Sequence, residues 1–247
     1  MKVICTVTLI VFLVPAFAET VPAIEWSQSS DRLSNGGTSW HSEELRLSSQ
    51  IALRHQIGGT LRQASRFGLA DRQIEINYAF PLTGRLTGAA TASGSSTHRF
   101  LPKSDFGASL QYEIAPAWLL NAGAVQSEYD KASVTKAVLG VEHYFSALRV
   151  ALGWRPSRAE GVMANGADVR VDYYYGDLDF IGLQAASGRE AANIDGRGVT
   201  VSAVRSAAII GRHGLTRNWT IRYGIEKVKQ GDFYNRTGVR LGAQYAF

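Results

Sequence analysis

The chain has a single cysteine, Cys5, which lies in an apolar segment at the amino terminus. Residues 1–18 combine a positively charged start, a short apolar run and the small-residue site Ala16-Phe17-Ala18, which together are typical of a secretory signal peptide. We predict cleavage before Glu19, so that the mature chain, residues 19–247, has no thiol. The mature chain then has no means of forming a disulfide, a cysteine-metal site or a cysteine nucleophile.

Long apolar runs are also missing. After the signal peptide no stretch approaches the ~18 consecutive apolar residues of a membrane-spanning helix, and helical periodicity is nearly absent. The formal charge of +5 is spread along the chain without a basic run, so we expect no binding to nucleic acid.

Motifs for catalysis are lacking as well. The sequence contains no HExxH, phosphate-binding loop or nucleophile elbow. Its histidines fall on predicted loops, turns and one strand end, and they are His41, His55, His98, His143 and His213. We predict a protein that is not an enzyme, with no catalytic residue, cofactor-binding residue or metal ligand. An outer-membrane lipid-modifying hydrolase, which would need a serine close to a histidine, is the alternative.

What the sequence does have is alternation of apolar and polar residues. Within residues 168–175, Val169, Val171, Tyr173 and Tyr175 share one face, and the charged residues lie on the other. About fourteen segments of ~10 residues repeat this pattern, the length that a tilted strand needs to cross a bilayer. They cover 22–32, 40–54, 57–68, 71–80, 83–94, 105–114, 117–128, 133–145, 147–156, 166–175, 177–187, 197–211, 217–227 and 236–247.

A secreted β-sandwich would also alternate, but the connections favour a membrane barrel. Short predicted turns at 55–57, 81–82, 116, 146, 176 and 212–216 alternate with longer segments at 33–39, 95–104, 156–165, 188–196 and 228–235. Aromatic residues cluster near the strand ends, as interfacial girdles require. We therefore predict an all-β fold: one transmembrane antiparallel barrel of about fourteen strands, with twelve as the alternative, in the Gram-negative outer membrane.

The last strand supports this prediction. A sheet in lipid must close, because an open edge would leave backbone groups unbonded. The final segment carries an outward stripe that ends in an aromatic residue and suits both closure and recognition by the barrel-assembly machinery; it consists of Val239, Leu241, Ala243, Tyr245 and Phe247. Outer-membrane lipid and this machinery are the predicted partners. No long inward-folded loop is evident, so we predict a monomer.

Closure would place the first three and the last two strands side by side, with basic residues facing the lumen. This predicted basic wall of the lumen comprises Arg46, Arg54, Arg62, Arg66, Arg222 and Arg240. The predicted acidic side comprises Asp168, Asp172 and Asp179. Such an arrangement would create a transverse field that sorts anions. The alternative is that these charges pair across strands and fill the interior.

Several stretches in order resemble the YaiO family of outer-membrane β-barrel proteins. They are RFGLADRQ (66–73), YEIAPAWLLNAGAVQSEYD (112–130), VLGVEHYFSALRVALGWRPS (138–157), SGRE (187–190) and YNRTGVRLGAQYAF (234–247). The resemblance covers the mature chain and implies a single outer-membrane barrel, without a defined reaction. Related barrels linked to exopolysaccharide handling suggest a substrate class.

We therefore expect a narrow pore or an envelope-support protein, linked to passage of an anionic solute or an exopolysaccharide. A surface structural or adhesion barrel is a further alternative, although its predicted external loops are short for a large binding surface.

Overall fold

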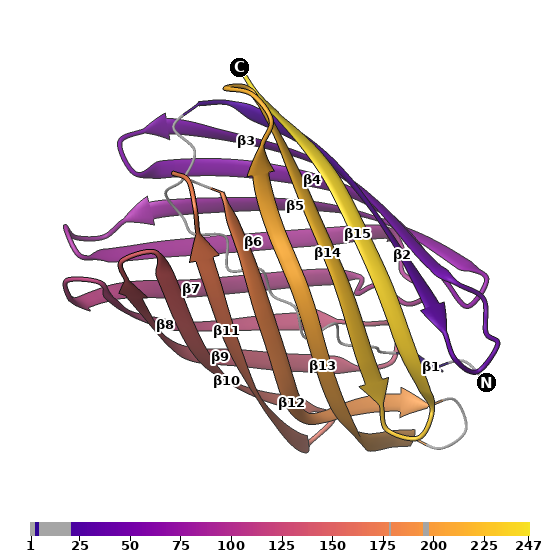
Figure 1. Ribbon diagram of the computed structural model, residues 1–247. Coiled ribbons are helices and arrows are strands. Elements are labelled where there is room, and N and C mark those ends of the chain that lie inside the picture. The colour runs from indigo at the N-terminus through magenta and orange to yellow at the C-terminus, as the bar shows by residue number, and fades with distance from the viewer. Residues whose placement is uncertain (1–2, 5–20, 178, 195–197) are drawn as a thin grey trace.

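The computed structural model describes residues 3–4, 21–177, 179–194 and 198–247. These residues form fifteen β-strands, and Figure 1 shows the long ones wrapped around a single barrel. The strands are β1 (Val3–Ile4), β2 (Ala23–Leu33), β3 (Trp40–Ala52), β4 (His55–Arg66), β5 (Leu69–Pro81), β6 (Leu86–Thr97), β7 (Ser104–Ala115), β8 (Trp118–Glu128), β9 (Ser133–Phe145), β10 (Leu148–Ala159), β11 (Val162–Tyr174), β12 (Phe180–Ile194), β13 (Gly198–Gly214), β14 (Trp219–Gln230) and β15 (Tyr234–Ala246). Within the described ranges, no helix is long and apolar enough to cross a membrane.

The barrel is a closed antiparallel meander. Each strand from β2 to β15 pairs with its neighbours in sequence, and β15 then pairs with β2 from Ala23↔Ala246 to Leu33↔Arg236. This closure satisfies the backbone groups that a sheet edge would expose to lipid. The predicted all-β barrel of fourteen strands is confirmed, and so is closure of the first strand on the last.

The predicted strand positions agree with the structure, but the distal loops are shorter than predicted. Strand β12, for example, extends to Ile194, whereas we expected a loop over 188–196. We predicted loops there because the segments are rich in glycine and serine. The strands nevertheless continue, because each residue pair added to two neighbouring strands forms further backbone hydrogen bonds. Most of the predicted signal peptide, residues 1–18, lies outside the described residues. Its Val3 and Ile4 form β1, a two-residue bridge to Ile194 and Asn193 of β12.

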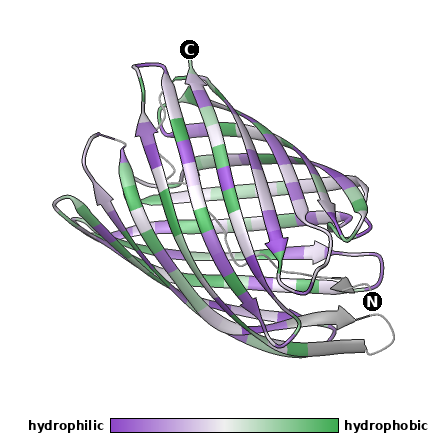
Figure 2. Ribbon diagram, turned by 45° about the vertical axis from the view of Figure 1, so that its right-hand side comes forward, coloured by the Kyte–Doolittle hydropathy of each residue, from purple (hydrophilic) through white to green (hydrophobic). Residues whose placement is uncertain are grey.

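Alternation sets the two surfaces of the barrel. Figure 2 shows hydrophobic and hydrophilic residues alternating along the strands. Large apolar side chains are exposed on the outer face, among them Ile74, Leu152 and Leu241. Most buried polar and charged side chains, such as Glu142 and Asp172, point inward. This is the reverse of a water-soluble protein, because here the solvent for the outer face is lipid.

The two rims of the barrel differ. We call the rim where β2 begins and β15 ends the terminal rim, and the opposite one the distal rim. Outward aromatic residues form a girdle at the terminal rim, where Trp118 stacks on His143, with ring centroids 4.0 Å apart, and Trp219 lies 5.1 Å from Tyr245. In the usual orientation of bacterial barrels, which have short periplasmic turns, the terminal rim faces the periplasm.

One two-residue distal connection agrees with the predicted strand positions. The predicted strands 57–68 and 71–80 leave room for only a short hairpin, and β4 joins β5 through Phe67 and Gly68 alone. Both residues have positive φ, 54° and 75°. This is the backbone of the two-residue turns that match the twist of paired strands, and glycine adopts it without steric cost.

Candidate functional site in the barrel lumen

A cluster of three arginines around one glutamate lies on the inner wall formed by β3, β4 and β15. Arg62 Nε lies 2.9 Å from Glu44 Oε1, and Arg240 Nη2 lies 3.1 Å from the same oxygen. Arg46 also interacts electrostatically with Glu44, and its Nε donates to Thr60 Oγ1 at 3.4 Å. One carboxylate therefore faces three guanidinium groups, and the cluster retains an excess of positive charge.

The accessible groups of this cluster are the cations. The side chains of Arg62 and Arg240 are 32% and 34% exposed, whereas that of Glu44 is 9% exposed. The neighbouring ion pair has the same inequality: the side chain of Arg222 is 27% exposed and that of Glu25 is 14% exposed. Arg222 Nη1 lies 3.4 Å from Glu25 Oε2. Because these side chains point inward, an ion in the lumen meets guanidinium groups before it meets their carboxylate partners.

The opposite wall, formed by β9, β10 and β11, carries a buried ion-pair network. Arg149 Nε lies 2.7 Å from Glu142 Oε2, and Arg149 Nη1 lies 3.1 Å from Asp172 Oδ2. The fully buried Asp172 is also 2.9 Å from Arg170 Nε. Beside this network Arg155 Nε pairs with Asp168. The charges on this wall satisfy one another and present little surface to the lumen.

Two inward glycines make room for these aspartates. Gly182 of β12 is directly opposite Asp172, and Gly153 of β10 is directly opposite Asp168. A Cβ atom at Gly182 would overlap Asp172 Oδ1, and one at Gly153 would lie 2.5 Å from Asp168 Oδ1. Each aspartate thus lies flat over a glycine on the next strand and reaches an arginine beside it.

Aromatic and apolar side chains narrow the lumen near the distal rim. Leu33, Trp40 and Tyr234 form a buried cluster there. The guanidinium carbons of Arg66 and Arg236 lie 4.8 and 5.4 Å from the centre of the Trp40 ring. Stacking of this kind stabilises a cation next to an aromatic face and fixes its position.

The loop joining β6 and β7 bends inward at the same rim. The buried carboxylate of Asp71 accepts hydrogen bonds from the amides of Arg99, Phe100 and Leu101 at 3.0, 2.8 and 2.9 Å. Phe100 and Leu101 are buried against Ala64 of β4. The Asp71 carboxylate and the packing of Phe100 and Leu101 thus hold this loop, residues 98–103, against the inner wall.

We expect Asp71→Ala to release the 98–103 loop. The substitution removes the acceptor of three amides, and a lost hydrogen bond to a charged group costs about 1.5–3 kcal/mol. Protease cleavage within 98–103 should become at least tenfold faster, as measured on barrels in detergent with the distal rim accessible. Asp105→Ala, which removes an inward carboxylate bonded to the side chains of Gln73 and Ser93, is the matched control. Equal cleavage rates for both variants would contradict the role of Asp71.

The structure brings most of the predicted site residues to the lumen but mixes their charges. Of the predicted basic wall, four arginines lie together on the inner face, and Arg66 lies at the distal rim. Arg54 lies in the β3–β4 turn, where its Nη1 donates to the carbonyl oxygens of Thr83 and Gly84 at 3.0 Å. On the acidic side, Asp168 and Asp172 are neutralised by arginines, and Asp179 lies in the β11–β12 turn, accepting from the Gly214 amide at 2.8 Å.

Sequence reasoning did not identify Asp71 or the inward loop. Alternation indicates that Asp71 points inward, but nothing in the sequence pattern shows that three amides 28 to 30 residues away converge on it. Among the residues that the structure describes, no group of three histidine, aspartate or glutamate side chains could hold a metal ion.

Solved structures share this architecture. The CymD monoaromatic hydrocarbon channel aligns with a TM-score of 0.66 at 9% identity, covering 94% of this chain and 90% of that one. The KdgM porin in complex with disordered oligogalacturonate aligns with a TM-score of 0.53 at 13% identity, covering 91% and 99%. An anion-selective porin from Comamonas acidovorans aligns with a TM-score of 0.51 at 12% identity, covering 92% and 99%. At these identities the likeness shows the fold alone.

Sequence comparison gives the family. No curated protein matches the chain. The family model described as the YaiO membrane beta barrel domain matches residues 22–193, which lie within the barrel and cover more than half of the chain. The chain therefore belongs to the YaiO family of membrane β-barrels, and it is a barrel of the Gram-negative outer membrane that shares its fold with solved porins.

Proposed function

We propose that the barrel is a narrow passage for small anionic solutes. The observation that carries this proposal is the unequal exposure on the wall of β3, β4 and β15, where Arg62 and Arg240 are about one-third exposed and Glu44 is buried. Charged rings and walls of this kind set ion selectivity in pores. A single barrel is the unit of passage, because the whole path lies inside one closed sheet.

The solute class that suits this wall is a small acid or a short acidic oligosaccharide. Guanidinium groups bind carboxylates through paired, charge-assisted hydrogen bonds, and Arg62, Arg240 and Arg46 present such donors along one wall. One structurally similar porin is described in complex with oligogalacturonate, and another is described as anion-selective. An oligogalacturonate and a simple anion are therefore suitable probes of this lumen.

Envelope support is the second candidate, and a specific observation favours it. The packed network around Asp172 and the inward 98–103 loop fill part of the lumen. A barrel whose lumen is filled by its own paired side chains would not conduct solutes. It would instead act as a stable structural protein of the membrane.

The proposal assigns no reaction to the barrel. His143 faces outward at the terminal rim, where it stacks on Trp118 and meets Phe145 edge-on, and its Nδ1 is 3.0 Å from the Ala117 carbonyl oxygen. That environment suits an interfacial polar residue. We further propose that the outward stripe of β15, with Tyr245 and Phe247 packed at the terminal rim, is the segment that the barrel-assembly machinery reads.

Single-channel recording of the refolded mature barrel in a planar bilayer tests the proposal. We expect a steady conductance with a reversal potential that indicates anion preference in a potassium chloride gradient. The preference should weaken as ionic strength rises from 0.1 to 1 M, because the Debye length falls from about 10 to about 3 Å. Tri-galacturonate should interrupt the current at lower concentration than neutral maltotriose. A barrel without measurable conductance would favour envelope support, and a preference for cations would contradict the proposal.

A further inference from the structure

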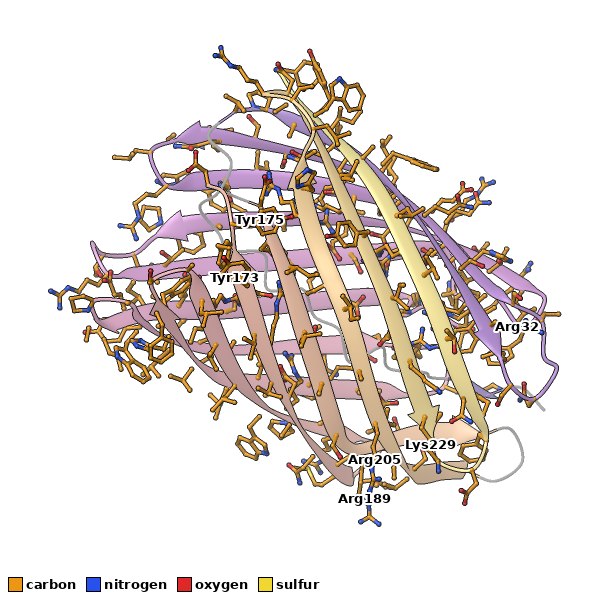
Figure 3. The ribbon with its side chains drawn as sticks, in the orientation of Figure 1. Arg32, Tyr173, Tyr175, Arg189, Arg205 and Lys229 are labelled. Carbon is orange, nitrogen blue, oxygen red and sulfur yellow. The ribbon has the colours of Figure 1, made fainter. Side chains whose placement is uncertain are left out.

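Basic side chains gather on the lipid-facing surface of the barrel near the distal rim. The distal basic patch consists of Arg189 on β12, Arg205 on β13, Lys227 and Lys229 on β14, and Arg32 on β2. All five side chains are exposed. Figure 3 shows Arg189, Arg205 and Lys229 close together at the end of the barrel away from Tyr173 and Tyr175, with Arg32 farther round the same end.

Strand register makes this a continuous surface. Arg205 is directly opposite Lys229 on the next strand, and Arg189 is diagonal to Arg205, since it is opposite Ala203. Lys227 is opposite Thr237 of β15, which is in turn opposite Arg32. Opposite and diagonal neighbours such as Arg189, Arg205 and Lys229 lie about 4.5–8 Å apart, within reach of one polyanionic group. Arg32 is two strands from Lys227, about 10 Å away.

The patch has no carboxylate partner among the residues that the structure describes. Among the described residues none of its five side chains forms an ion pair, and no outward position of β2, β14 or β15 is acidic. Like charges directly opposite each other on paired strands are destabilising, and Arg205 and Lys229 are so placed. An anion bound between them would remove this repulsion, so the patch suits a ligand that carries several negative charges.

The height of the patch corresponds to a lipid headgroup. On β14, ten residues separate Trp219 in the terminal girdle from Lys229, a path of about 33 Å at 3.3 Å per residue. At a strand tilt of about 40° this becomes about 25 Å along the membrane normal, which is the height of the apolar band of such barrels. The patch therefore lies at the headgroups of the outer leaflet.

The surface directly below the patch is apolar. Ile209, Ile225 and Val239 form one row across β13, β14 and β15, and each is about half exposed. A ligand that used both surfaces would have a polyanionic head and hydrocarbon chains beneath it. A soluble anion would leave the apolar row unused.

We propose that the distal basic patch binds the phosphate groups of a phosphorylated glycolipid, the class of lipid that forms the outer leaflet of the Gram-negative outer membrane. Arg205 and Lys229 bind the phosphates, and the apolar row of Ile209, Ile225 and Val239 contacts the acyl chains. This binding is on the outer surface and does not depend on passage of a solute through the lumen.

Binding of lipid A by the refolded barrel in a non-ionic detergent tests the proposal, measured by native mass spectrometry. In the double variant Arg205→Gln, Lys229→Gln we expect binding to weaken by about 30-fold, because each basic residue near an anionic membrane surface contributes about 1 kcal/mol. The matched control is Arg72→Gln, Arg158→Gln. These arginines are also outward and exposed near the distal rim, but their cross-strand neighbours, Gln63, Thr97, Thr135 and Met163, are uncharged. The control should weaken binding less than threefold.

Dephosphorylated lipid A should bind the wild-type barrel as weakly as intact lipid A binds the double variant. Equal affinity for the two lipids, or an equal loss in the control variant, would overturn the proposal. Binding of inorganic phosphate alone with the affinity of lipid A would also overturn it in favour of a free-anion site. If the double variant does not fold, Lys229→Gln alone should weaken binding about fivefold.

Discussion

Replacing Arg62 and Arg240 with glutamine is expected to abolish the anion preference of the lumen. Both guanidinium groups are about one-third exposed, so an ion passing along this wall comes within a few ångströms of them. A unit charge at 4 Å contributes about 1 kcal/mol in water, and loss of two of them raises the energy of an anion while lowering that of a cation. The permeability ratio of chloride to potassium should fall by at least tenfold, as read from reversal potentials in a salt gradient.

Removing the acidic partner of the same ion pairs should change the ion selectivity in the opposite direction. Glu44→Gln removes the buried carboxylate that both arginines share, so it should raise the preference for anions. The outward pair Arg72→Gln, Arg158→Gln removes the same charge as the lumen double variant and should leave selectivity unchanged. A lumen variant with the selectivity of the wild type would show that this wall does not sort ions.

Asp172→Ala is expected to destabilise the barrel by about 3–5 kcal/mol, the usual cost of removing one partner from a buried ion pair. Asp172 is fully buried between Arg149 and Arg170, and its loss leaves two buried guanidinium groups with less compensation. The free energy of unfolding by urea, measured from tryptophan fluorescence in lipid vesicles, checks the value. Asp172→Asn retains the shape and two acceptor lone pairs, so we expect an intermediate loss.

Two further variants distinguish the contribution of the ion-pair network around Asp172 from the general effect of removing a charge in the lumen. Glu113→Ala removes an inward carboxylate on β7 that forms no ion pair within the described part of the chain, and it should cost less than about 1 kcal/mol. Gly182→Ala keeps every charge but places a Cβ atom where Asp172 Oδ1 lies, so it should be destabilising in the same direction as Asp172→Ala. A loss for Asp172→Ala no larger than that for Glu113→Ala would show that the network adds nothing to stability.

Much of the fold could be predicted because a barrel strand obeys a period of two. The pattern at 168–175 separates outward Val169 and Val171 from inward Asp168 and Asp172, and the structure has them on those faces. The carboxyl-terminal stripe predicted closure, which pairing of β15 with β2 confirms. Loop lengths were predicted less well, because glycine and serine occur both in loops and in strands that continue beyond the apolar band.

The candidate site could be predicted only as a set of inward charges. Periodicity indicates that Arg240 and Arg222 point into the lumen, but it does not indicate which carboxylate each one meets. Arg240 pairs with Glu44, 196 residues earlier in the chain and two strands away around the closed barrel. Reasoning from neighbouring strands divided the lumen into a basic and an acidic wall, whereas each of the two lumen walls in the structure contains both arginines and carboxylates that pair with them.

Local alternation, and the need to bond every backbone group in lipid, were enough to predict the inward or outward face of most side chains, an approximate number of strands and the membrane as the solvent of the outer surface. Which side chains meet could be seen only in the folded barrel. The height of a residue on its strand and its position around the barrel depend on turn lengths, register and closure together. The shared Glu44, the amide-binding Asp71 and the row joining Arg205 to Lys229 all arise from that register, which no single segment of the chain contains.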